Sequence, residues 1–231
     1  PKPGIWSYSA TNYSQLKLKK RTSDLSETPT IKVQPFISWS DNISSALNIM
    51  KNIYSKNGVT LDVFETINLP ESKYDNVSYD FSDSITSEMV SNGFEDRVNL
   101  FFINDYLDKD YLGNSSGIPG SQGLVGSHNG VLISLKAHKN DDGNLNYQLL
   151  GETAGHGMGH FLGLFHPNEE GGNLFDPIED TPKCSIGRST ADLCGLEKGA
   201  DNLMFWSPWS GGNQDNLTEG QVYVLKRALI A

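Results

Sequence analysis

Four short apolar segments predict the strands of a β-sheet. They lie at residues 31–36, 59–64, 97–103 and 131–135, and each follows polar or glycine-containing sequence. Segments of this length that are rich in valine, isoleucine and phenylalanine are typical of buried or half-buried strands. The segment 97–103 is a stronger candidate for a buried strand than the segments at 31–36 and 59–64.

Apolar residues at every third or fourth position predict two long helices. The first is expected to begin near Ser40 or Asp41 and to end near Gly58, and the second is expected over residues 147–164. The apolar stripe of the first helix consists of Ile43, Leu47, Met50 and Tyr54.

Two shorter helices are also predicted. One lies around residues 83–91 in an otherwise polar stretch. The other follows Thr218–Gln221, where the spacing of a hydroxyl residue and a glutamine matches a capping box. The apolar side of this last helix carries Val222, Leu225 and Leu229.

This order of elements indicates an α/β domain. We expect a single domain over residues 1–231, with an upper lobe at about 31–166 and a smaller, irregular lobe at about 167–231 that ends in the C-terminal helix. The first 30 residues or so are polar and are expected to run over the surface. A cleft is expected between the two lobes.

The chain is acidic, with a formal net charge of −10 over 231 residues. Negative charge disfavours binding to nucleic acids and to anionic membranes, because both are themselves negative. No stretch approaches the roughly 18 consecutive apolar residues of a membrane-spanning helix. We therefore expect neither a nucleic-acid partner nor a membrane span, and we expect a monomer.

Three of the five histidines of the chain stand close together, at positions 156, 160 and 166. Residues four apart share a helix face, so His156 and His160 can direct their rings to one point. Gly163 stands where the helix can end in a left-handed turn, which would bring His166 back as a third nitrogen ligand. Three protein ligands with a fourth position open are typical of a catalytic zinc ion. His128 and His138 fit no motif and are expected to be solvated or in loops.

This spacing resembles the metzincin signature H-E-x-x-H-x-x-G-x-x-H at every specified position except the glutamate, which is Gly157 here. The resemblance implies a metzincin-like α/β (α+β) fold. Such a fold has a twisted mixed sheet and two long helices in its N-terminal lobe, and a zinc cleft below them. It also implies a zinc-dependent endopeptidase, in which the missing glutamate would accept the proton of the metal-bound water. With glycine at 157 we expect little or no peptidase activity.

Two explanations of Gly157 are open. We prefer an engineered, inactivated variant of a zinc endopeptidase, because neutral drift tends to erode metal ligands once catalysis is lost. The alternative is a natural pseudo-peptidase that holds zinc and binds peptides without cutting them. Glu152, one helical turn before His156, is a conceivable substitute base. The preferred interpretation of Glu152 is a residue of the first helical turn, favoured there by the helix dipole.

A methionine follows the histidines, as the resemblance requires. Metzincins have a methionine turn beneath the zinc, and Met204 stands 38 residues after His166, just before Ser207-Pro208. An isolated methionine of this kind would be interpreted as a core residue. Several metzincin families have a tyrosine two positions later. This chain has Trp206 there, which cannot act as a phenolic ligand.

The segment between the histidines and the methionine favours one family among the metzincins. Asp180-Thr181-Pro182 resembles the Asp-Thr-Pro stretch of pappalysin and cytophagalysin-like enzymes, and matrixins are the alternative family. Some pappalysin-like enzymes bind calcium in this region, so Asp176, Glu179 and Asp180 are candidate Ca²⁺ ligands. The alternative, which we prefer, is a solvated acidic loop, because carboxylates are usually exposed.

Two cysteines, Cys184 and Cys194, follow the histidine motif. They can form a disulfide in an oxidising compartment, which would indicate a secreted protein, or they can be free thiols in a cytosolic one. We prefer the disulfide and secretion.

The glycine-rich segment 113–130 is expected to be flexible and leads into the strand at 131–135. In metzincins the equivalent strand borders the cleft and binds the substrate in extended form. A protein or peptide substrate is therefore expected to pair with this strand as an edge strand. An ordinary edge strand protected by its glycine-rich flank is the alternative.

Overall fold

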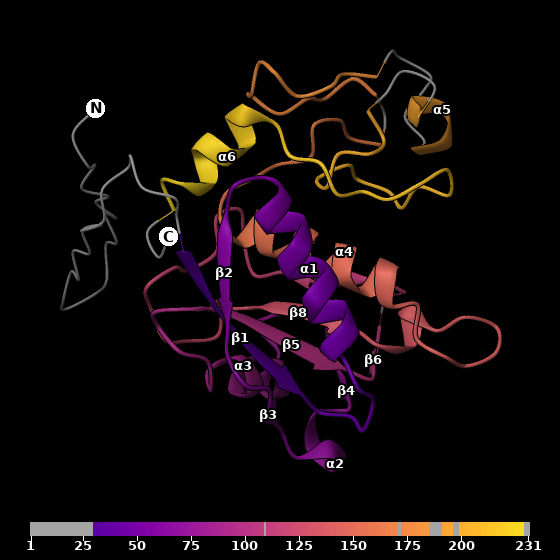
Figure 1. Ribbon diagram of the computed structural model, residues 1–231. Helices are drawn as coiled ribbons and strands as arrows, with labels where there is room; N and C mark the ends of the chain where they lie inside the picture. The colour runs from indigo at the N-terminus through magenta and orange to yellow at the C-terminus, as the bar shows by residue number, and fades with distance from the viewer. Residues whose placement is uncertain (1–29, 109, 171, 185–190, 196–198, 229–231) are drawn as a thin grey trace.

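A mostly parallel β-sheet forms the centre of the molecule (Figure 1). The computed structural model describes residues 30–108, 110–170, 172–184, 191–195 and 199–228. The strands follow the order β2-β1-β5-β8-β7, and β3 pairs with the end of β1. Their bounds are β1 (Thr30–Ile37), β2 (Thr60–Val63), β3 (Ile67–Asn68), β5 (Val98–Ile103), β7 (Gly113–Ser115) and β8 (Val131–Ser134).

The sheet is mixed, as predicted, because one strand runs against the others. β1, β2, β3, β5 and β8 pair in parallel, whereas β7 pairs antiparallel with β8. The expectation that the strand at 131–135 has a free edge is wrong. β8 lies between β5 and β7, because the start of the glycine-rich segment 113–130 forms a strand of its own and covers that edge.

Helices cover both faces of the sheet. The long helices α1 (Ser44–Lys56) and α4 (Tyr147–Phe161) lie on one face, and α3 (Ser84–Val90) lies on the other (Figure 1). The remaining elements are short: α2 (Glu71–Tyr74), β4 (Asn76–Val77), β6 (Asp105–Tyr106), the 3-10 helix η1 (Lys136–His138), α5 (Ala191–Gly195) and α6 (Glu219–Leu225). β4 and β6 pair as a small separate sheet.

The central strand β5 shows why both faces need a cover. All six of its residues are buried. Successive side chains of a strand point to opposite faces, and Leu100 and Phe102 join the core under α1 and α4, whereas Phe101 and Ile103 join the core under α3. A strand covered on both faces is largely apolar in sequence, and the burial of all six residues confirms the prediction that this segment is a buried strand.

The ends of the helices follow local hydrogen-bonding groups. α1 begins at Ser44, three residues or more later than expected, where the Asn42 side chain accepts a hydrogen bond from the Ser44 amide. The capping box of α6 is confirmed, since Thr218 and Gln221 bond reciprocally. The predicted contribution of Leu229 to this helix, and the surface segment expected at the N-terminus, lie outside the described residues.

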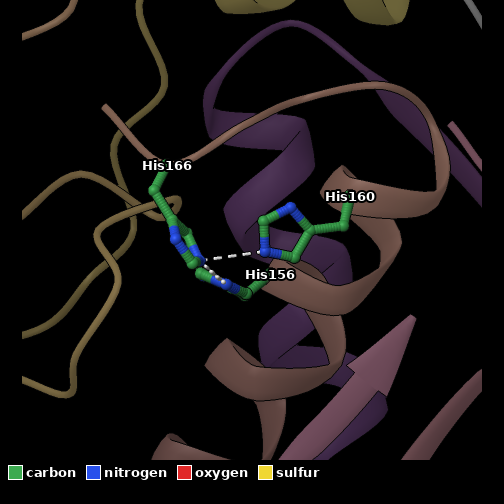
Figure 2. A group of neighbouring side chains, drawn as sticks. All are labelled: His156, His160 and His166. Atoms are coloured by element: carbon green, nitrogen blue, oxygen red, sulfur yellow. Dashed lines mark hydrogen bonds between the residues drawn. The ribbon is translucent and has the colours of Figure 1, made fainter. Parts of the chain in front are cut away.

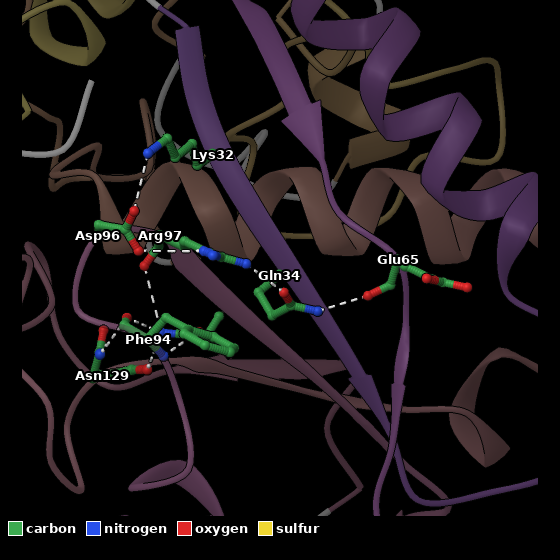
Figure 3. A network of polar contacts seen from close by, with 8 residues as sticks. Lys32, Gln34, Glu65, Phe94, Asp96, Arg97 and Asn129 are labelled. Carbon is green, nitrogen blue, oxygen red and sulfur yellow. Dashed lines mark hydrogen bonds and ion pairs between the residues drawn. The ribbon is translucent and has the colours of Figure 1, made fainter.

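A polar network joins β1 to β5 at one end of the sheet (Figure 3). Arg97 donates to the side chain of Gln34 at 2.8 Å, and its guanidinium lies between the rings of Phe64 and Phe94. Gln34 in turn donates to the Glu65 carbonyl at 2.8 Å. The buried amide of Gln34 is thus fully used in holding the strands in register.

The C-terminal part of the chain lies beyond α4, on the side of that helix away from the sheet (Figure 1). Its described residues are mostly irregular, with two short helices. A disulfide joins Cys184 to Cys194, as predicted, and packs with Phe205 in a small apolar cluster. Of the helices in the described ranges, none combines the length and the apolar character needed to cross a membrane.

Candidate metal centre

The three predicted histidines meet at one point (Figure 2). His156 and His160 project from the last two turns of α4, and His166 enters from the loop that follows. Gly163 has φ +109°, a left-handed conformation that glycine adopts without steric cost. The chain reverses there, which brings His166 back over the helix as the spacing predicted.

The Nε2 atoms of the three rings are close enough to share one ion. His166 Nε2 lies 3.2 Å from His156 Nε2 and 3.0 Å from His160 Nε2. Zinc–nitrogen distances of about 2.0–2.1 Å with tetrahedral angles place ligand nitrogens about 3.3 Å apart. The observed separations therefore fit a zinc ion.

The other nitrogen of each ring has an oxygen acceptor. His156 Nδ1 donates to the Leu203 carbonyl at 2.8 Å, and His160 Nδ1 donates to the Leu164 carbonyl at 2.7 Å. His166 Nδ1 lies 3.1 Å from both carboxylate oxygens of Glu169. A neutral imidazole that donates from Nδ1 has a lone pair at Nε2, so three lone pairs face one another. This arrangement is unfavourable unless a cation lies between them.

The environment also keeps the two helical rings, His156 and His160, neutral. Burial lowers the pKa of His156 well below its ordinary value, and His160 and His166 lower it further. Burial, followed by the neighbouring His166, lowers the pKa of His160 to about 4. Neutral imidazole is the form that binds metal. Among the described residues no fourth histidine, cysteine or carboxylate joins this group. Side chains of these types could therefore occupy three coordination positions of a bound ion.

Met204 lies against the histidine helix. It is completely buried, and a Cβ atom built on Gly159 would lie 2.4 Å from its sulfur. Gly159 lies between His156 and His160 and has no side chain, so the turn that carries Met204 can approach the helix backbone here. The residue before it, Leu203, supplies the carbonyl that accepts from His156, so this turn and His156 are in direct contact. Trp206 packs instead beside Phe205, against the disulfide cluster.

Position 157 faces the sheet. Gly157 is buried, and a Cβ atom built there would lie 2.5 Å from Cγ1 of Val131 in β8. Real Cβ atoms do not approach a carbon atom this closely, so any side chain at 157 requires Val131 to move. Gly151 has a similar role on another face of α4, where a Cβ would lie 2.8 Å from the Ala46 carbonyl oxygen in α1.

The three carboxylates considered for calcium do not form one ligand group. Asp176 accepts from the Thr181 hydroxyl at 2.6 Å, and Asp180 accepts from the Thr218 hydroxyl and the Gly220 amide, both at 2.8 Å. Within the described part of the chain, only the histidine trio forms a group of three or more potential ligand side chains. The Asp-Thr-Pro stretch thus closes its own turn and caps α6, and the structure does not support the expected calcium site.

Two other sequence interpretations need correction. Glu152 lies in the second turn of α4 and is buried, not in the first turn, and its Oε1 accepts from the Gln214 amide at 3.0 Å. His138 is also buried, and its Nε2 lies 2.8 Å from the Thr153 hydroxyl of α4. Neither burial is visible in local periodicity, because each depends on a partner distant in sequence. His128 is exposed in a loop, as expected.

Sequence reasoning missed two contributors to the centre, Glu169 and Gly159. Glu169 stands only three residues after the last ligand, a spacing that could have identified it. Gly159 occupies an unspecified position of the motif, and only its contact with Met204 shows its role.

Comparisons with known proteins add little. No protein-family model matches the chain, and no curated protein matches it in sequence. The archaemetzincin structure from Methanopyrus kandleri is 14% identical, with a TM-score of 0.47, over 87% of this chain and 96% of that one. The archaemetzincin structure from Archaeoglobus fulgidus is 18% identical, with a TM-score of 0.40, over 69% of this chain and 96% of that one. At these scores the likeness identifies neither a family nor a function, so both depend on the geometry of the site.

Proposed function

We propose that this chain has a metallopeptidase-type zinc centre that binds an extended peptide but lacks the base needed to hydrolyse it efficiently. The observation that carries the proposal is the convergence of three Nε2 atoms whose partner Nδ1 atoms all have acceptors. His156, His160 and His166 would hold the ion. Bound zinc would supply Lewis acidity, polarising a carbonyl group and lowering the pKa of a bound water to about 7.

The chain lacks the general base that a zinc peptidase needs for hydrolysis. A peptidase of this type needs a carboxylate next to the first histidine to accept the proton of the water and pass it to the leaving amine. Gly157 has no side chain, and the loss of a positioned general base costs about 100- to 10,000-fold in rate. We therefore expect hydrolysis to be very slow.

The packing around position 157 supports a native rather than an introduced glycine. Val131 occupies the space that a side chain at 157 would need, and Gly151, Gly157 and Gly159 each bring α4 close to a different neighbour. The alternative of a natural pseudo-peptidase is therefore the one that we propose.

A peptide partner would bind along the edge of the sheet. Two backbone hydrogen bonds, from the Ser134 amide to the Leu112 carbonyl and from the Ser116 amide to the Gly130 carbonyl, set the register of β7 on β8. Hydrogen bonds alternate along an antiparallel pair, so the amide and carbonyl groups of Gly113 and Ser115 point away from β8. Ser115 is paired with Val131, which contacts Gly157, so this edge leads to the centre. An extended peptide can add to such an edge.

Two finer assignments belong to the same proposal. The Asp180-Thr181-Pro182 stretch before the cysteines favours the pappalysin and cytophagalysin-like group within the metzincins. The disulfide between Cys184 and Cys194 favours a secreted protein, because disulfides persist in oxidising compartments.

The metal is tested first. Elemental analysis of the purified chain should find one zinc ion, and alanine at position 156, 160 or 166 should remove it. His128→Ala is the matched control, because His128 is an exposed histidine outside the trio. If the native chain and the three variants contain the same amount of zinc, the proposed centre does not exist.

The chemistry is tested by restoring the base in a background that has room for it. We compare Gly157→Glu/Val131→Ala with Gly157→Gln/Val131→Ala, which has the same shape without a carboxylate. When loaded with zinc, the Gly157→Glu/Val131→Ala variant should hydrolyse an unfolded protein such as casein at least about 100-fold faster than the Gly157→Gln/Val131→Ala variant. Equal rates in two variants that both bind zinc would show that this is not a peptidase centre.

A further inference from the structure

The three histidines differ in what holds them. His156 and His160 donate from Nδ1 to backbone carbonyls, whereas His166 lies against the side chain of Glu169. Both oxygens of that carboxylate are 3.1 Å from His166 Nδ1. His166 is also the ligand that comes from a loop rather than from the helix. Its orientation therefore depends most on contacts of its own.

The backbone of Glu169 is fixed by a tight hairpin. Its amide donates to the Leu174 carbonyl at 3.0 Å, and its carbonyl accepts from the Gly172 amide at 2.8 Å. Gly172 has φ +65°, a conformation that permits this turn. Asn168 pairs with Phe175 across the base of the hairpin.

A buried side chain ties this hairpin to the disulfide region. Asn168 is completely buried, donates from Nδ2 to the Glu169 carbonyl at 3.2 Å and accepts from the Cys184 amide at 3.3 Å. The position from which the Glu169 side chain extends is thus held from two directions. The carboxylate reaches His166 from a fixed point, not from a mobile loop.

We propose that Glu169 is a positioning residue for the metal centre, which fixes the ring and the tautomer of His166. The inference rests on the proposed zinc function. A carboxylate that accepts from Nδ1–H leaves the lone pair on Nε2, where the ion binds, and makes that nitrogen more basic. Because the Nδ1 acceptors of the other two ligands are backbone groups, Glu169 is the acceptor that can be removed by substitution.

The chain provides a matched control for charge. Glu170 is adjacent, carries the same charge and is exposed. Among the described residues no hydrogen bond or ion pair joins it to the three histidines. A general effect of negative charge near the ion would therefore appear in variants of either residue, whereas a positioning effect requires Glu169.

The experiment measures zinc affinity by competition with a chromophoric chelator in the full chain. Glu169→Ala should bind zinc about 10- to 100-fold more weakly than the native protein, whereas Glu170→Ala should bind it within about twofold. Glu169→Gln should bind more tightly than Glu169→Ala, because the amide oxygen still accepts from Nδ1. Far-UV circular dichroism of the metal-free variants checks that the fold is kept.

The measured zinc affinities decide whether Glu169 has the positioning role. Affinity of Glu169→Ala within twofold of native, or equal losses in the Glu169 and Glu170 variants, would overturn the positioning role. If Glu169→Ala does not fold, Glu169→Leu, which also lacks an acceptor, is compared with Glu170→Leu, and equal affinities of these two variants overturn the role. Failure of the native chain to bind zinc would instead refute the proposed function, so the two failures are distinguishable.

Discussion

Asn202 and Gln221 exchange two hydrogen bonds, at 2.9 and 3.1 Å, between the methionine turn and the first turn of α6. Both side chains are buried. Asn202 also accepts from the Met204 amide at 2.9 Å, and the intervening residue, Leu203, holds His156. The C-terminal helix therefore helps to position His156, which lies far from it in sequence.

Removal of either amide should destabilise the chain. Asn202→Ala or Gln221→Ala leaves a buried polar partner without its bond, at a cost of about 1–3 kcal/mol. The double variant should lose less than the sum, with a coupling of about 1 kcal/mol or more. Urea unfolding of the metal-free proteins measures this. As a control, Asn144→Ala, at an exposed asparagine, should change the free energy of unfolding by less than about 0.5 kcal/mol. Additive losses in the Asn202/Gln221 double variant would contradict the pairing of these two side chains.

Two glycines of the histidine helix should respond in opposite directions to the same substitution. Gly155→Ala should stabilise the protein by about 0.5–1 kcal/mol, because its Cβ would meet only ordinary contacts at 3.5 Å and alanine favours the helix. Gly159→Ala should destabilise it by about 1–2 kcal/mol, because its Cβ would press on the Met204 sulfur. Thermal unfolding compares the two, and equal stability of the two variants would show that the methionine does not constrain this position.

Binding of an extended peptide should depend on the outward amide of Ser115. Ser115→Pro removes that donor while leaving the bonds of Asn114 to β8 in place. Ser115→Ala keeps the donor and removes the same hydroxyl. We expect the proline variant to bind an immobilised denatured protein at least about fivefold more weakly than the alanine variant, as one lost hydrogen bond of about 1 kcal/mol requires. Both should retain zinc, and equal binding would exclude this edge as the peptide site.

His138 should make the stability of the metal-free chain depend on pH. Burial lowers its pKa to about 4 in the folded state, against an ordinary value of about 6.5. Between these values the unfolded chain binds more protons, so stability increases with pH. The contribution is complete above about pH 6.5 and is lost as the pH falls towards 4, with a size on the order of 3 kcal/mol.

The test compares native protein with His138→Gln in the presence of a chelator. Unfolding free energies should converge as the pH falls from 7 to 4.5, because only the native chain loses the His138 contribution. The other titrating groups are common to both proteins and cancel in the difference. A difference that stays constant over this range would show that the ring is not held neutral by the fold.

Much of the architecture was predictable because local pattern determines it. The stripe from Ile43 to Tyr54 and the apolar run in β5 identified their elements, since three- or four-residue spacing and short apolar runs depend on near neighbours alone. The histidine spacing predicted that the three rings meet for the same reason, because His156 and His160 share a helix face and Gly163 permits the turn to His166.

The sequence by itself thus determined the kinds of element, their order and the three histidines that meet at one point. Tertiary structure alone decided that β8 is covered by β7, that Val131 fills the space beside Gly157, and that Asn202 meets Gln221. Each of these relationships joins residues distant along the chain. Such contacts follow from how whole elements pack together, which no short window of sequence specifies.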